Sequence, residues 1–473
     1  MNDNSAKTLI VVSLALCLIT FSVALLQPRY LGEYFYLGAL IFIEAMLIAL
    51  WGFARRFFPV LIGVFLWAGM DIPLRELWIS RRWFVLAIAA IAGFAIYIRD
   101  RRHTFTGFHL TALFCVVSAI VSALVSSYPQ TAILKALSLF LLFAYAATGA
   151  RLAMSEREGR FCFGLLLGCE LLVWIGVISY FVFRRPIFGN PNSLGAIFGV
   201  VVLPVLLWGT FVSQQPNLYR RRIFALMLGL LLLFASYSRA GILAATISCI
   251  VLCISLGRYR MLIKGVGAAL LAAFLIATIA PMNLTESGSL SQFVYKGEQE
   301  KGLLASRRSV WEQAVISIRR RPWLGSGFGT VATNYDTTIA QTAGFESGGV
   351  TSEHGNSYLA ITEWVGLLGV VPFFALALVV AIRSVRVLVW LSRTRDPFSP
   401  AVPIALIMIA GLIHAGFEDW LFAVGYYLCV FFWSLAFILM DVLPATPANF
   451  VSASPGFTFA TPSANLDPAM SGR

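Results

Sequence analysis

Long apolar runs recur along almost the whole chain, and they constrain its fold more than any other feature. Runs long enough to cross about 30 Å of hydrocarbon begin near residues 8, 31, 57, 83, 107, 130, 161, 194, 222, 240, 261, 357, 402 and 420. Hydrophobic residues make up 59% of the chain and charged residues 12%, which leaves too little polar surface to cover a soluble globule. The pattern predicts an all-α, polytopic integral membrane bundle of about 12–14 transmembrane helices.

Lysine and arginine residues gather in alternate loops between these runs, which predicts the sidedness of the chain. A net charge of +13 would suggest nucleic acid in a soluble protein, but here the cations lie in short loops, where they set topology, and we expect no nucleic-acid partner. By the positive-inside rule these loops and both termini are cytoplasmic; the loops are residues 55–56, 99–102, 151–160, 220–222, 258–264 and 383–395. The unusual polar clusters then all fall on the external side, in residues 184–192, 236–241, 282–355 and 414–419.

Four segments follow from this arrangement. We expect an N-terminal transmembrane bundle of about 11 spans over residues 1–281, a large periplasmic loop over 282–355, C-terminal transmembrane helices over 356–443, and a disordered cytoplasmic tail over 444–473. Within the loop, an amphipathic helix is predicted from about residue 306 to 319. All seven cysteines lie in apolar segments, so neither a disulfide framework nor a thiolate metal site is indicated.

Arg239 is the most informative single residue, because it lies inside the apolar stretch 222–256, in the phrase Ser236-Tyr237-Ser238-Arg239-Ala240-Gly241. An arginine at bilayer depth is costly unless it faces a polar cavity, so it predicts a functional site for an anionic ligand; the alternative is a side chain that snorkels to the surface. These 35 residues are long for one crossing and short for two. The turn at Arg239 is therefore expected below the membrane surface, beside a cavity.

Other external residues could carry chemistry. His354 titrates near neutral pH and could orient or deprotonate an attacking hydroxyl, with Glu353 as an alternative base. His414, Glu418 and Asp419 form a second cluster that could bind sugar hydroxyls, orient an arginine, or pair structurally. A Gly-rich phrase at residues 325–329 resembles a phosphate loop only superficially, since it follows a helix and lacks a lysine.

An ordered set of phrases carries a resemblance to a known family. The set comprises residues 188–195 (FGNPNSLG), the Ser-Arg-Ala-Gly phrase at 238–241, residues 320–329 (RRPWLGSGFG), His354 with residues 355–359 (GNSYL), and residues 363–369 (EWVGLLG). In this order, over about residues 184–440, the chain resembles the O-antigen ligase and O-antigen polymerase (Wzy-type) superfamily of membrane glycosyltransferases. The family often has His-Asn directly, whereas here Gly355 intervenes.

The resemblance implies a GT-C-like fold and a metal-independent transfer without a cofactor. The donor would be a glycan on undecaprenyl diphosphate, and the acceptor a hydroxyl on lipid A core, another glycan or a protein, on the periplasmic face of the bacterial cytoplasmic (inner) membrane. Physical chemistry is compatible with this, because the developing charge of a lipid diphosphate needs preorganised cations, and arginine matches phosphate oxygens. The sequence also contains no Asp-x-Asp pair to hold Mg²⁺.

The resemblance also implies roles for individual residues. Arg239 would contact the diphosphate and His354 would act on the acceptor hydroxyl. Arg307 and Arg308 resemble a second cation of the family, although a solvated helix face explains either one equally well. Arg321 is the best candidate among three arginines that could simply close the C-terminal end of the loop helix.

The remaining candidates for binding diphosphate or glycan have structural alternatives. Arg185 could attract the anion or mark a membrane boundary. Asn190 and Asn192 could bind carbohydrate or cap a helix, and Asn356 and Glu418 complete the set.

A transporter or flippase for lipid-linked sugars is the alternative function, since Glu44, Lys135, Glu170 and Glu363 lie within predicted spans. A transporter predicts polar residues at the midplane and pseudo-symmetry between halves. Here the polar groups gather on one side around one large loop, which favours an enzyme.

Overall fold

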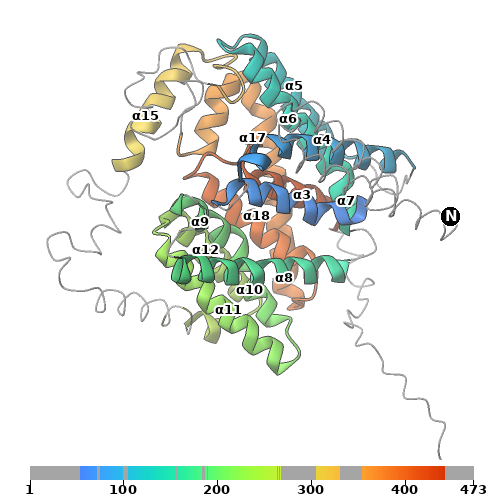
Figure 1. Ribbon diagram of the computed structural model, residues 1–473, viewed down its shortest axis with the longest axis vertical. Coiled ribbons are helices and arrows are strands. Elements are labelled where there is room, and N and C mark those ends of the chain that lie inside the picture. The colour runs from blue at the N-terminus through green and yellow to red at the C-terminus, as the bar shows by residue number, and fades with distance from the viewer. Residues whose placement is uncertain are drawn as a thin grey trace, which may run out of the picture.

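The protein is a bundle of α-helices in a computed structural model that describes residues 54–71, 75–99, 105–154, 158–183, 187–188, 190–263, 265, 267, 305–330 and 354–442 (Figure 1). No strand occurs in these ranges. The predicted spans near residues 8 and 31, Glu44, Arg185, Glu353, most of the span near 261 and the tail lie outside them.

The first half of the described chain supplies helices that are apolar along most of their length. They are α3 (Ala54–Gly69), α4 (Arg75–Arg99), α5 (Gly107–Leu124), α6 (Pro129–Tyr145) with a π-helical turn η3 (Ala146–Ala150) and α7 (Arg151–Met154), and α8 (Glu158–Val177) with η4 (Ile178–Val182). Next come α9 (Pro191–Ile197), η5 (Phe198–Val202), α10 (Leu203–Phe211), α11 (Pro216–Ala235) and α12 (Arg239–Ser255).

The second half contributes α15 (Ala305–Arg320), α17 (Ser357–Thr394), α18 (Ala401–Ala415) and α19 (Tyr427–Val442). Within the described residues, five helices are long and apolar enough to cross a membrane: Gly107–Leu124, Pro129–Met154, Glu158–Val182, Asn192–Phe211 and Ser357–Thr394. This confirms the all-α, multi-pass membrane architecture.

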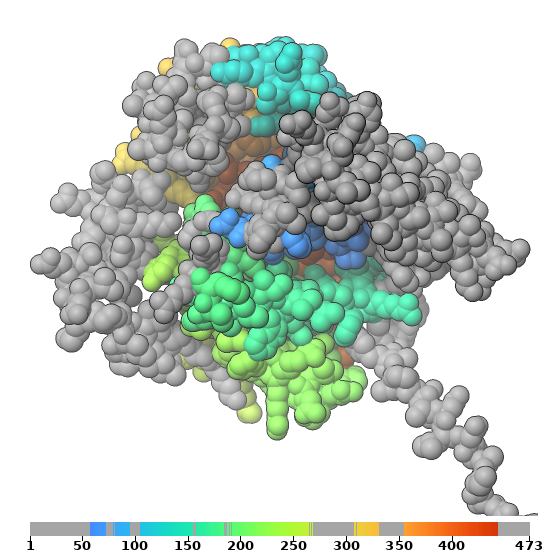
Figure 2. Space-filling view, in the orientation of Figure 1, coloured from blue at the N-terminus to red at the C-terminus, as the bar shows by residue number. Residues whose placement is uncertain are grey.

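Burial separates the centre of the bundle from its lipid-facing surface. Helices α18 and α19 are almost completely buried, whereas large apolar side chains on the outer faces of α5, α8 and α17 are exposed, for example Leu113 and Leu368. In lipid such exposure carries no penalty. α5 and α8 to α11 form much of the coloured surface of the face in Figure 2.

The bounds of helices α11 and α12 explain how the stretch around Arg239, which is long for one membrane crossing and short for two, is folded. α11 begins at Pro216, earlier than the apolar run itself, so it has 20 residues and α12 has 17. The two helices are joined by a tight turn in which Tyr237 has a positive φ of 52°. Arg239 is therefore the first residue of a helix rather than a charge in the middle of one.

The last span begins later than the apolar run indicates. α19 starts at Tyr427, and the residues before it form a buried loop instead of a helix. The carbonyl oxygen of Leu421 in this loop accepts hydrogen bonds from the Trp433 indole Nε1 at 2.6 Å and the Cys429 Sγ at 3.2 Å. These side-chain donors replace the backbone bonds that a continuous helix would supply.

Helix α17 is broken near its start, at Gly366, where φ is 70° and ψ is 178°. The break frees backbone groups, and residues 322–327 at the end of α15 satisfy them reciprocally. Ser326 and Gly327 donate to the carbonyls of Glu363 and Trp364, while Leu367 and Leu368 donate to the carbonyls of Pro322 and Trp323. These four hydrogen bonds tie the Gly-rich turn to α17, and α15 packs beside that helix (Figure 1).

Candidate functional site

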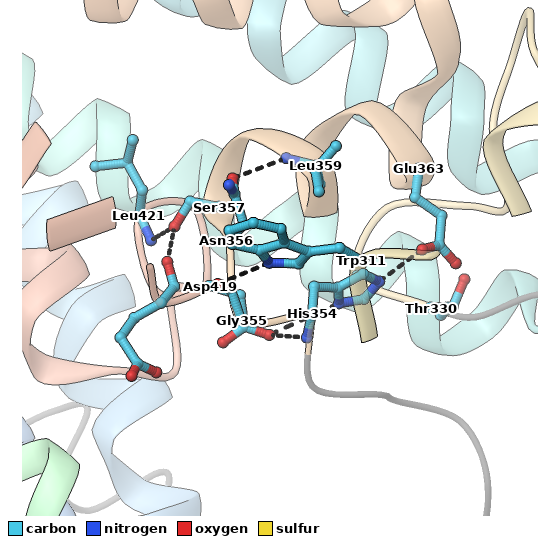
Figure 3. A network of polar contacts seen from close by, with 12 residues as sticks. Trp311, Thr330, His354, Gly355, Asn356, Ser357, Leu359, Glu363, Asp419 and Leu421 are labelled. Atoms are coloured by element: carbon cyan, nitrogen blue, oxygen red, sulfur yellow. Dashed lines mark hydrogen bonds and ion pairs between the residues drawn. The ribbon is translucent and has the colours of Figure 1, made fainter. Parts of the chain in front are cut away.

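His354 lies between two carboxylates directly before α17 (Figure 3). Its Nε2 is 2.7 Å from Glu363 Oε2, and its Nδ1 is 3.6 Å from Asp419 Oδ2. The backbone N–H of His354 also donates to that Asp419 oxygen at 2.8 Å. The His354 and Glu363 side chains are 1% and 0% exposed, whereas that of Asp419 is 26% exposed. Of the three groups, Asp419 is the one that reaches the surface.

The charge state of His354 follows from these contacts. Burial lowers the pKa of the imidazole, but contact with Asp419 and Glu363 and their negative charges outweigh burial and raise the pKa to about 10. Burial would also raise the pKa of Asp419, yet its hydrogen bonds and attraction to His354 hold it below the usual value. At neutral pH the ring is therefore an imidazolium and Asp419 a carboxylate.

The segment after His354 is built to hold this geometry. Gly355 has a φ of 57°, and a Cβ at this position would collide with the guanidinium of Arg307. The Trp311 indole donates to the Gly355 carbonyl at 3.3 Å, which ties α15 to the loop. Gly355, the departure from the family's His-Asn phrase, is thus the residue that lets Arg307 come close.

Asn356 caps α17. Its Oδ1 accepts from the backbone N–H groups of Tyr358 at 2.9 Å and Leu359 at 3.2 Å, which is the capping geometry expected of Asn. Ser357 then donates to the Glu418 carbonyl at 2.6 Å and accepts from the Leu421 N–H at 3.1 Å. These bonds attach the start of α17 to the loop that carries Glu418 and Asp419.

Arg307 is the loop cation that faces this site. Its Nη2 is 2.5 Å from Glu418 Oε1, and both side chains are largely buried, at 18% and 15% exposure. Glu418 therefore orients an arginine, one of the alternatives that its sequence position left open. Neighbouring Arg308 instead points to solvent, where it pairs with Glu312 one helical turn away at 79% and 60% exposure.

Arg239 reaches the same region from another helix. It is half-buried, and it lies near enough to Arg307 for the two charges to repel each other. Ser238 caps α12 by accepting from the Gly241 N–H at 3.3 Å. A Cβ on Gly241 would collide with the backbone carbonyl of Gly195, so glycine allows α9 and α12 to touch here. The Ser-Arg-Ala-Gly phrase is thus a helix start that fixes where Arg239 stands.

Two cations and a helix start make this region suitable for an anion. The N-terminus of α12 carries a partial positive charge, and Arg239 adds a full charge at the same point. Guanidinium groups match the oxygens of a phosphate, so the two arginines can bind a phosphate-bearing ligand beside the carboxylates.

Several predicted residues lie elsewhere or have structural partners. Arg321 is exposed and donates weakly to the Val125 carbonyl at 3.4 Å, so it contacts the end of α5. Asn190 caps α9, with its Oδ1 accepting from the Asn192 N–H at 2.8 Å. The side chain of Arg185 is outside the described residues.

Asp419 and Glu363 are the site residues that the sequence did not single out. Asp419 appeared only as a member of a cluster, and Glu363 only as one of the charges within predicted spans that motivate the transporter alternative. Glu363 lies nine positions after His354, and Asp419 lies 65 positions after it. The available signal was the charge of Glu363 inside an apolar span.

The intramembrane charges in the described residues each have a polar partner nearby. Glu170 pairs with Arg221 at 2.9 Å and lies 3.7 Å from Arg222, and the Lys135 Nζ donates to the Gly329 carbonyl at 2.5 Å. Among the described residues, no group of three or more His, Cys, Asp or Glu side chains is arranged to hold a metal ion.

Part of the chain is similar to one known protein family. No curated protein matches the chain. The family model of O-antigen ligase matches residues 224–374, a segment that contains Arg239, Arg307, His354 and Glu363. The segment starts within α11, spans α12 and α15, and ends in α17 beyond the break at Gly366. Over residues 224–374 the chain is therefore similar to the O-antigen ligase family.

Proposed function

We propose that the protein transfers a glycan from undecaprenyl diphosphate to an acceptor hydroxyl on the periplasmic face of the bacterial inner membrane. The acceptor class is lipid A core or a growing polysaccharide, with a protein hydroxyl as a further possibility. The observation that carries the proposal is the meeting of Arg239 and Arg307, from two separate helices, beside the buried His354 network.

Chemistry assigns the two arginines to the leaving group. When the bond between the anomeric carbon and the diphosphate breaks, negative charge grows on phosphate oxygens, and fixed guanidinium groups stabilise it. Glu418 holds Arg307 in one position before substrate binds. We propose that these side chains, rather than a metal ion, supply the positive charge.

The carboxylates and His354 serve the acceptor. They lie around the start of α17, next to Arg307 through Gly355, and we propose that a hydroxyl bound there attacks the anomeric carbon from the face opposite the diphosphate. The intramembrane charges in the described part of the chain have local partners, and they do not form a series of groups that could pass a proton or an ion across the membrane. They therefore do not favour transport.

Adjacent arginines provide the test. Arg307→Ala is expected to lower the transfer rate by about 100-fold, because it removes a cation from the charged transition state. Arg308→Ala is the matched control, one position along the same helix, and should stay within about twofold because its pair with Glu312 is exposed. The measurement is glycan transfer by the purified protein in liposomes, with lipid-linked glycan extracted from the source cells.

Each acceptor class is supplied in a separate reaction, and a metal chelator is present throughout. Formation of a new glycosidic bond identifies the acceptor. If the glycan instead crosses the liposome membrane with no bond formed, the protein is a transporter and the proposal fails. Equal loss of the transfer rate in both arginine variants would show that Arg307 contributes no more to the reaction than its exposed neighbour.

A further inference from the structure

We propose that Asp419 is the group that takes the proton from the attacking hydroxyl, and that His354 is a positioning residue that holds Asp419. The inference rests on the proposed glycosyl transfer and assigns its base. It differs from the expectation drawn from the sequence, in which the histidine itself handles the proton.

Accessibility is the first argument. His354 is 1% exposed, and its two ring nitrogens face Glu363 and Asp419. Both nitrogens that can exchange a proton therefore lie beside carboxylates of the protein itself. Asp419 is in contact with the same ring but keeps 26% of its side chain exposed, so it is the member of the network that an acceptor can approach.

Charge is the second argument. A base must arrive without its proton, and an imidazole held between two carboxylates keeps its proton at neutral pH. Asp419 is ionised under the same conditions. Its low basicity is acceptable here, because an alcohol becomes strongly acidic only once its oxygen is bonding to the anomeric carbon.

The step balances as a single displacement. The acceptor oxygen forms a bond to the anomeric carbon while the bond from that carbon to the diphosphate oxygen breaks. The electron pair of the broken bond leaves with undecaprenyl diphosphate, beside Arg239 and Arg307. The hydroxyl proton passes to the Asp419 carboxylate and from there to water.

Other charged and titratable groups also lie near Asp419. Glu363 acts through the shared histidine, and Glu418 precedes Asp419 in the loop with its charge paired to Arg307. Tyr426, in the loop before α19, is close enough to feel the charges of both loop carboxylates. His354 itself is a cation in direct contact with Asp419.

The pH dependence of transfer separates the two possible bases. If Asp419 is the base, the rate of the unaltered protein is level through neutral pH and falls as pH approaches about 10, where His354 loses its proton. If His354 is the base, the rate must rise over the same interval, because more of the ring becomes deprotonated. A rising profile overturns the proposal.

Variants give a second, independent readout. Asp419→Asn keeps the shape of the side chain and is expected to lower the rate by about 100-fold to 10,000-fold. Binding of undecaprenyl diphosphate, measured by quenching of tryptophan fluorescence, should stay within about twofold, which also shows that the variant is folded. Asp419→Asn with an unchanged rate overturns the assignment.

His354→Gln tests the positioning role. Loss of the imidazolium raises the pKa of Asp419 toward the ordinary value, so the acid limb of the pH profile should move to higher pH while measurable transfer persists. A purely structural histidine would lower the rate at every pH without moving that limb. Should Asp419→Asn fail to accumulate, Asp419→Glu replaces it, with a changed rate and retained lipid binding expected.

Failure of this inference is distinguishable from failure of the proposed function. If Arg307→Ala loses transfer while Asp419→Asn keeps it, glycosyl transfer stands and the base is another group. If the unaltered protein forms no glycosidic bond with any acceptor at any pH, the proposed function fails, and the assignment of Asp419 fails with it.

Discussion

His354 shows how one buried side chain can set the chemistry of its neighbours. Two carboxylates hold its proton, and in return its charge keeps Asp419 ionised. A buried ion pair is costly unless its geometry is good, and removal of one partner leaves an uncompensated charge. The three residues therefore form one unit, in which replacing either carboxylate changes the titration of His354.

The pH dependence of stability follows from this unit. The pKa of His354 is raised from 6.5 to about 10 in the folded protein, so the native state binds the proton more tightly than the unfolded state. Its contribution is complete below pH 6.5 and is lost as pH rises through about 10. We expect the thermal midpoint, followed by tryptophan fluorescence, to fall over this interval, and His354→Gln to flatten the decline.

Arg307 and Arg308 show where sequence reasoning reaches its limit at the residue scale. The two arginines are adjacent and equivalent in the sequence, but one is held at the site by Glu418 and the other pairs with Glu312 in solvent. The choice depends on the rotation of α15 against α17. The Trp311 bond to Gly355, a contact between residues 44 positions apart, is one of the long-range contacts that hold this rotation.

At the scale of elements, local patterns predicted most of what is observed. The amphipathic period over residues 306–319 gave a helix that the structure extends to Ala305–Arg320, because a 3.6-residue period is a local property. Asn190 and Asn356 cap helices, and this is also a local property, because each side chain accepts from backbone N–H groups two or three residues further along the chain. The break at Gly366 left no such signal, because its backbone partners come from residues 322–327.

Contact between α9 and α12 leads to a prediction about glycine. Gly241→Ala should destabilise the protein by about 1–3 kcal/mol, because the added methyl group meets the Gly195 carbonyl and must push the helices apart. Gly168→Ala, in α8, is the control, since a Cβ there meets no other atom within 4 Å. Thermal unfolding in detergent compares the two; equal midpoints would mean that the α9–α12 contact is not tight.

For the whole molecule, composition alone predicted a multi-pass helical bundle, because lipid admits so few alternatives. Sidedness was predicted separately from the loop cations. The arrangement of the site could not be predicted in the same way. His354, Arg307 and Asp419 come from three segments, and their meeting depends on how α12, α15, α17 and α18 pack.

Sidedness can be tested with one cysteine in α15 and another near the C-terminal end of α17. Arg308→Cys, on the exposed face of α15, should react in intact cells with a maleimide that cannot cross the inner membrane. Arg393→Cys, exposed near the C-terminal end of α17, should react only after the membrane is opened. The six described native cysteines are buried or half-buried, so their background should be low. The reverse pattern would invert the assigned orientation.

The attachment of residues 322–327 to the break in α17 also determines how α15 can move. Four hydrogen bonds fix one end of this helix, whereas Arg307 lies near its other end. At 1.5 Å per residue the two points are about 20 Å apart. A swing of α15 about the Gly-rich turn would have to break the Trp311–Gly355 and Arg307–Glu418 contacts, and a rotation of only about 10° would carry Arg307 several ångströms while the turn stays in place. Arg307, the proposed diphosphate-binding cation, lies at the end that would move.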